Sequence, residues 1–231
     1  ETRWLNEAMA QIAFFVCGYG HAPQAFQYIR NTDVNMEDFN NSLENYGAAY
    51  LWTYYLLTHY GGATVEAQRN FINTLVSNKK LSFDSIEEVL KATGVQKPVK
   101  DGFVDWAVAN AAADPSIDGG RYGYDASIKF GVNNANQTYG LESLSSDTIK
   151  EKVNAWACDY IVYTNDTSYS PHRPSMIDRI TVSGVKPGAV VWNVNDRELP
   201  PAKIVPEGSA INEGEKFVTT ALAPSENGKH E

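Results

Sequence analysis

The residues of this chain that could take part in catalysis or metal binding are its histidines, cysteines and carboxylates. Their spacing limits the kinds of site that they could form. The four histidines are His21, His59, His172 and His230. No two of them lie four residues apart, so the chain has no His-Glu-x-x-His zinc motif. Neither Cys17 nor Cys158 has a neighbouring histidine, and no Gly-x-Ser-x-Gly elbow is present. The sequence therefore gives little support to a serine or cysteine hydrolase, and it leaves open whether the two cysteines pair.

Several other polar residues have both a possible functional role and a plainer structural interpretation. Asp114, Asp118 and Asp125 flank a Gly-Gly pair, and oxygen ligands in a glycine-rich loop suit calcium. Their spacing is not that of an EF-hand, so solvated loop acids are the plainer interpretation. His59 ends an apolar run just before a glycine, which favours a residue at a helix C-terminus. His172 lies between two prolines, which favours a solvated linker residue.

The stretch Trp4-Leu-Asn-Glu-Ala-Met-Ala10 is the most specific pattern in the chain. It resembles the third-ligand helix of gluzincin zinc metallopeptidases, in particular the hyicolysin-like and immune-inhibitor-A-like bacterial peptidases. In that group a His-Glu-x-x-His helix provides two zinc ligands and a glutamate on a later helix provides the third. The resemblance implies that Glu7 is a metal ligand and that Asn6 supports it. The alternative for a lone glutamate on an amphipathic helix is an exposed or capping carboxylate.

The resemblance continues through Tyr46-Gly-Ala48 and the apolar run that follows, and it covers roughly residues 3–163. It implies that Tyr46 stabilises the oxyanion of the reaction, whereas an ordinary core tyrosine is the alternative. The chain departs from the family at Ala8, where relatives carry glycine, and at Gln11, where relatives often carry an acid. These departures, together with the missing histidine pair, leave open an inactive homologue. The resemblance does not extend to the last 60 or so residues.

The resemblance also sets expectations about the intact protein. The chain opens on Glu1 without a signal-peptide pattern, so we expect a piece of a longer secreted, extracellular precursor whose upstream part carries His-Glu-x-x-His. The expected partners are that upstream part and a peptide or protein substrate. The expected activity of the parent is peptide-bond hydrolysis by a zinc-activated water. The chain alone is expected to be inactive and to hold no zinc. The alternative, from another class, is a non-catalytic structural protein, such as a surface-layer or filament subunit, built on a degenerate peptidase fold.

The amino-acid composition limits the classes of binding partner. The 231 residues carry a net charge of −9, and 43% of them are hydrophobic. A protein with this charge lacks the basic face that nucleic acids and anionic membrane surfaces require. No apolar run approaches the roughly 18 to 20 residues of a membrane span. The sequence therefore predicts no nucleic-acid partner and no membrane span.

Hydrophobic periodicity predicts the elements that must position these residues. Apolar spacing predicts helices over 4–16, 43–59, 65–76 and 101–112, and a capping box at Ser85-Ile-Glu-Glu88 predicts a further helix ending at Gly94. Residues 19–40 are predicted to form a polar connection. Shorter alternating segments predict strands over the ranges 128–130, 160–163, 180–182, 189–194, 203–205 and 217–221.

These elements predict an α+β protein with two parts. A mostly helical gluzincin C-lobe is expected over residues 1–168, in which Glu7 and Tyr46 lie. A proline-containing linker over 168–175 separates it from a small β-sandwich-like domain over 176–224. Residues 225–231 are predicted to form a frayed tail.

Overall fold

The computed structural model describes residues 3–80, 82–125, 128 and 153–160 with their side chains, and it describes the backbone of 161–164. It also describes the backbone of several strand segments. These are residues 137–140, 180–181, 189–194, 202–204, 210–211 and 216–221. The predicted linker and tail lie outside the described residues.

The described region is mostly helical, which confirms this part of the predicted fold class. Its six α-helices are α1 (Arg3–Val16), α2 (Ala25–Tyr28), α3 (Leu43–Tyr60), α4 (Val65–Ser77), α5 (Ser82–Ala92) and α6 (Val99–Ala112). A short 3-10 helix, η1 (Ile117–Gly120), follows α6. None of the described helices is long and apolar enough to cross a membrane.

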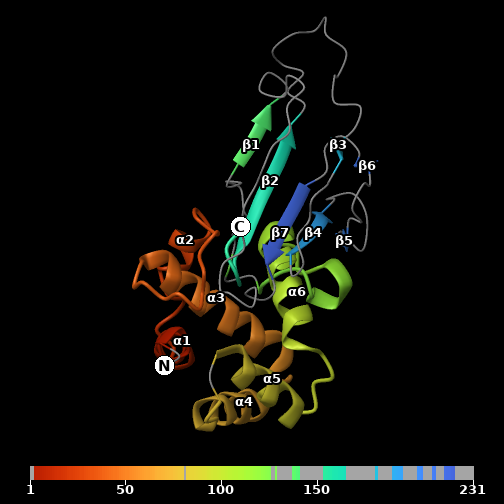
Figure 1. The fold of residues 1–231 in the computed structure, drawn as a ribbon. Coiled ribbons are helices and arrows are strands. Elements are labelled where there is room, and N and C mark those ends of the chain that lie inside the picture. Colours follow the sequence, from red (N-terminus) through yellow and green to blue (C-terminus); the bar gives the residue numbers. More distant parts are fainter. Residues whose placement is uncertain are drawn as a thin grey trace, which may run out of the picture.

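Helix α3 is the centre of this helical part. Its side chains are buried on every side from residue 47 to residue 57, as the nearly unbroken apolar run predicts. The Ser42 side chain begins the helix by accepting a hydrogen bond from the Asn45 backbone N–H at 3.1 Å. Helices α1, α2, α4 and α6 all contact α3, and Figure 1 shows α1 and α2 on one side of it and α6 on the other.

The short helix α2 lies within the stretch predicted to be a polar connection, so that prediction was wrong for residues 25–28. Four residues are too few to show a helical period in the sequence. The helix is held by packing, because Ala25 and Tyr28 are buried against the core. Gly47 of α3 permits this approach, since a Cβ atom there would overlap the Gln24 carbonyl oxygen and lie 2.8 Å from the Tyr28 Cβ.

Helix α5 begins three residues before the predicted capping box, so Ser85 is not its first cap. Ser85 is instead fully buried inside the helix. Tertiary packing decides the start, because Phe83 stacks on Trp156 with ring centroids 3.6 Å apart and lies 5.0 Å from the Trp4 ring. The Trp4 indole N–H also donates to the Ser82 hydroxyl at 3.1 Å.

The core between α3 and α6 is aromatic. Trp52 lies 5.6 Å from Trp106 and 5.4 Å from Phe103 between ring centroids, and Trp106 stacks on Tyr28 at 5.4 Å. All four rings are almost completely buried. Such pairs contribute about 0.5–1.5 kcal/mol each beyond the burial of their area. This cluster therefore fixes how α2, α3 and α6 are packed.

The strand segments form two sheets. One has the order β1-β2-β7-β4-β5, in which β1 (Gln137–Gly140) is parallel to β2 (Cys158–Thr164) and the other pairs, with β7 (Lys216–Ala221), β4 (Ala189–Val194) and β5 (Ala202–Ile204), are antiparallel. The other pairs β3 (Ile180–Thr181) with β6 (Ala210–Ile211). The predicted strand over 128–130 lies outside the described residues apart from Ile128, which is not in a strand. A separate domain over 176–224 stays a prediction.

Candidate functional site

Glu7, the predicted metal ligand, lies on α1 and is half-buried. The buried face of α1 consists of Trp4, Leu5, Ala8 and Ile12. Glu7 follows Trp4 by three residues, so it lies at the edge of this face and is partly exposed to solvent.

Tyr46, the predicted oxyanion donor, lies near the start of α3 and is also half-buried. Its ring packs edge-on against Phe39, with centroids 5.1 Å apart. Tyr50 and Tyr54 follow at intervals of four and therefore share its helix face, but both are completely buried. Of the three tyrosines on this face, Tyr46 is thus the one with part of its side chain in solvent.

A polar cluster that the sequence did not predict surrounds His21. The His21 Nδ1 lies 2.5 Å from the Tyr50 hydroxyl oxygen, and the ring stacks on Phe15 at 4.9 Å between centroids. Burial lowers the pKa of His21, while Asp125 acts in the opposite direction. Burial raises the pKa of Tyr50, so its hydroxyl stays protonated and donates a hydrogen bond to the neutral imidazole. The regular spacing of Tyr46, Tyr50 and Tyr54 is the only sign of this cluster in the sequence.

Asp125 belongs to the same region, because it accepts a hydrogen bond from the Tyr54 hydroxyl. The Tyr54 ring in turn lies edge-on to the His21 ring at 5.1 Å. The cluster joins α3 to the loop before α2 and to the loop after η1. His21, Tyr50, Tyr54 and Asp125 make a packed, hydrogen-bonded junction, and it contains one histidine and one carboxylate as metal-binding groups.

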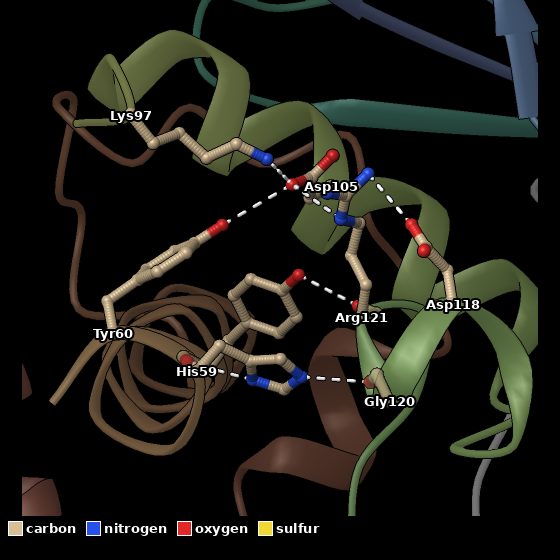
Figure 2. Close-up of polar contacts among 8 residues, drawn as sticks. His59, Tyr60, Lys97, Asp105, Asp118, Gly120 and Arg121 are labelled. Atoms are coloured by element: carbon tan, nitrogen blue, oxygen red, sulfur yellow. Dashed lines mark hydrogen bonds and ion pairs between the residues drawn. The ribbon is translucent and has the colours of Figure 1, made fainter. Parts of the chain in front are cut away.

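A second polar network surrounds Asp105 of α6 (Figure 2). Its carboxylate is almost completely buried and forms an ion pair with Lys97. Arg121 Nε lies 3.7 Å from the same carboxylate, and the Tyr60 hydroxyl donates to it at 3.3 Å. Two cations and a hydroxyl around one buried carboxylate compensate for its desolvation. The network connects α3, α6 and the loop after η1. These segments are far apart in the sequence, so no local sequence pattern could predict their contacts.

His59 lies beside this network, in the last turn of α3. Its Nδ1 is 3.1 Å from the Tyr55 carbonyl oxygen and its Nε2 is 3.0 Å from the Gly120 carbonyl oxygen. The Tyr55 hydroxyl donates to the neighbouring Arg121 carbonyl at 2.8 Å. The last two turns of α3 are therefore bonded twice to the backbone at the end of η1, at Gly120 and at Arg121.

The three loop acids considered for calcium do not converge. Asp114 accepts hydrogen bonds from the backbone and hydroxyl of Ser116, and these lower the pKa of its carboxyl group. Asp118 pairs with Arg121 at 2.9 Å, and Asp125 bonds to Tyr54. In the part of the chain that the structure describes, no group of three or more His, Cys, Asp or Glu side chains could hold a metal ion. Cys17 and Cys158 are not joined by a disulfide, and Cys17 is exposed whereas Cys158 is buried.

Comparisons of the chain with protein-family models, with curated proteins and with solved structures each find no match.

Proposed function

We propose that this chain is the C-terminal part of a secreted gluzincin-type zinc metallopeptidase, with a helical lobe that carries Glu7 and Tyr46 followed by a small β domain. The observation that supports this best is the combination of the Trp4-Leu-Asn-Glu7 sequence with the placement of Glu7. A metal ligand must face an open surface from a rigidly held helix. Glu7 is partly exposed on α1, and buried Trp4, one turn away, holds this end of the helix to Ser82.

The described side chains do not form a zinc site by themselves. Zinc in such enzymes takes three protein ligands, and among the described residues no group of three or more His, Cys, Asp or Glu side chains could hold a metal ion. His21 and His59 are engaged with Tyr50 and with two backbone carbonyls. In the proposed parent the two histidines and the general base therefore come from the upstream sequence, and this chain contributes one carboxylate. Half-buried Tyr46 is the side chain that we assign to the oxyanion.

The coding sequence upstream of Glu1 gives the simplest test. A His-Glu-x-x-His motif there supports the metallopeptidase. Its absence overturns the proposal and favours the alternative, a non-catalytic extracellular structural protein built on the same fold.

In the longer protein that carries this motif, we expect Glu7→Gln to lower both zinc content and peptidase activity. Changing groups that merely hydrogen-bond to zinc ligands typically costs 10–100-fold, so loss of a ligand is expected to cost more than about 100-fold in kcat/KM. Glu44→Gln is the matched control, because Glu44 is also a half-buried carboxylate near one end of a helix. Normal zinc content and activity in Glu7→Gln would rule out the ligand role.

The chain alone is expected to bind no zinc at micromolar affinity and to cleave no peptide. One carboxylate at the edge of a helix face lacks the additional ligands that such affinity requires. Titration with zinc chloride, followed by calorimetry, measures this directly. A stoichiometric site that disappears in Glu7→Gln and in one histidine variant would show that this chain has its own metal centre.

A further inference from the structure

We propose that Ser82 and Glu37 are positioning residues of the proposed zinc site. They hold the first half of α1, which carries Glu7, in a fixed position relative to the start of α3, which carries Tyr46. This role rests on the proposed function, and it belongs to two residues that no sequence motif selected. Its basis is a chain of hydrogen bonds that runs from α1 through α5 to residues 35–42, the loop before α3, which we call the strap.

The side-chain part of this chain has a single direction. The Trp4 indole N–H can only donate, and the Ser82 hydroxyl oxygen accepts from it at 3.1 Å. The Ser82 hydroxyl has one proton, which it donates to the Glu37 carboxylate. The carboxylate makes this second bond charge-assisted, and neighbouring hydrogen bonds in a chain strengthen one another. Trp4 is almost completely buried, so water does not compete for its N–H.

The backbone of Ser82 indicates that these two bonds determine where the residue lies. Its φ is +55°, in the left-handed region where a serine is strained. Glycine would adopt this conformation freely, but it has no hydroxyl to place between Trp4 and Glu37. A strained conformation persists only where the surrounding contacts determine it. Here those contacts are the two hydrogen bonds and the packing of the next residue, Phe83, whose ring centroid lies 5.0 Å from that of Trp4.

The strap continues the connection to α3. The Glu37 backbone N–H donates to the Asn35 side-chain oxygen at 2.9 Å, and the Asn45 side-chain amide donates to the Asn35 carbonyl oxygen at 3.2 Å. The Asn45 side-chain oxygen accepts from the Asn40 backbone N–H at 3.1 Å. Asn45 is completely buried and directly precedes Tyr46. The strap is therefore attached to α5, and through it to α1, at Glu37, and to the first turn of α3 at Asn45.

These attachments bear on both residues of the proposed site. Glu7 follows Trp4 by three residues, so about one helical turn separates the proposed metal ligand from the anchored indole. Tyr46 follows the anchored Asn45 directly. A displacement of about 1 Å in a catalytic constellation can cost about 100-fold in rate. The strap therefore contributes to catalysis through the positions of these two turns and not through contact with the substrate.

The hydrogen-bond chain is tested in the unmodified sequence context without reference to a peptidase. The reporter is the exchange of the Trp4 indole N–H with solvent, followed by ¹⁵N NMR. Glu37→Ala should make this exchange about two- to fivefold faster, because the Ser82 hydroxyl loses its charged acceptor. Asp38→Ala is the matched control, since Asp38 is the neighbouring exposed carboxylate of the strap. Equal exchange in Glu37→Ala and Asp38→Ala overturns the chain, and the positioning role with it.

Two substitutions of Ser82 separate positioning from stability in the longer protein that carries the upstream motif. Ser82→Ala and Ser82→Gly both remove the hydroxyl, but only glycine relieves the left-handed backbone. The zinc-free Ser82→Gly variant should therefore unfold at a higher temperature than Ser82→Ala. Both should bind zinc about three- to tenfold more weakly in competition with a chelator, a smaller effect than the loss of a group bonded directly to a ligand. Normal affinity in Ser82→Gly with reduced affinity in Ser82→Ala would show that affinity only follows stability, and it overturns the positioning role.

Glu7→Gln distinguishes failure of this role from failure of the proposed function. If Glu7→Gln binds zinc as tightly as the unmodified protein, the ligand role of Glu7 is wrong and the positioning role falls with it. If Glu7→Gln loses zinc while Ser82→Ala and Ser82→Gly bind it normally, the positioning role alone is wrong. Loss of zinc in Glu7→Gln, with equally weakened binding in the two Ser82 variants, supports both.

Discussion

Gly47→Ala is expected to lower the free energy of unfolding by about 2–3 kcal/mol, in the upper part of the range for overpacking a core. The new methyl group would overlap the Gln24 carbonyl oxygen, and a backbone atom cannot rotate away as a flexible side chain can. Helix α2 must therefore move off α3, which also disturbs the contact between Tyr28 and Trp106. Urea unfolding followed by circular dichroism measures the loss.

Gly102→Ala is the matched control, because Gly102 is also a buried glycine within a helix. A Cβ atom there would meet the Tyr60 ring at 3.4 Å and the Trp52 ring at 3.6 Å, which are ordinary contacts. Alanine should then be neutral or stabilise α6 by up to about 1 kcal/mol. If Gly47→Ala unfolds at the same urea concentration as Gly102→Ala, the close approach of α2 to α3 is wrong.

Asp105→Ala is expected to cost about 3 kcal/mol, because it leaves Lys97 without its ion-pair partner in a partly buried position. Breaking a buried ion pair typically costs 3–5 kcal/mol. The lower end applies here, since 25% of the Lys97 side chain and 45% of the Arg121 side chain remain exposed to solvent. Thermal and urea unfolding at moderate salt measure the change.

Asp118→Ala provides the comparison for Asp105→Ala. Asp118 also pairs with Arg121, but 46% of its side chain is exposed. Surface ion pairs contribute about 0–1 kcal/mol, so this variant should differ little from the unmodified chain. The double variant Lys97→Met with Asp105→Leu should recover much of the stability lost in Asp105→Ala, because it removes both charges together. Equal losses in Asp105→Ala and Asp118→Ala would contradict the buried network.

The helices that the sequence predicted well are those whose own residues determine them. The spacing of Trp4, Ala8 and Ile12 predicted α1, and the unbroken apolar run around Trp52 predicted a buried α3. Helix α2 and the first turn of α5 depend on partners elsewhere in the chain, namely the space above Gly47 and the rings of Trp4 and Trp156. The hydrophobic periodicity of a segment carries no information about distant packing partners. Helix α2 and the first turn of α5 were therefore not predicted from the sequence.

In the candidate site, too, local sequence patterns predicted some features, whereas contacts between distant residues could not be predicted. Sequence motifs selected Glu7 and Tyr46, and the half-buried position of Glu7 follows from the helix period alone. Their proposed roles depend on residues upstream of the chain and stay predictions. The contacts of His59 with Gly120 and of Asp105 with Arg121 join residues 61 and 16 positions apart. Such contacts follow from the packing of α3, α6 and the loop after η1, which the sequence does not display.

The aromatic cluster between α3 and α6 makes the helical lobe its own spectroscopic reporter. The indoles of Trp52 and Trp106 lie 5.6 Å apart at an interplanar angle of 55°, close and oblique enough for their electronic transitions to couple. Coupled transitions absorb left- and right-circularly polarised light unequally, and this difference is lost when the rings lose their fixed mutual orientation. Near-ultraviolet circular dichroism of the unlabelled chain thus distinguishes a lobe with ordered packing from one that merely retains its helices.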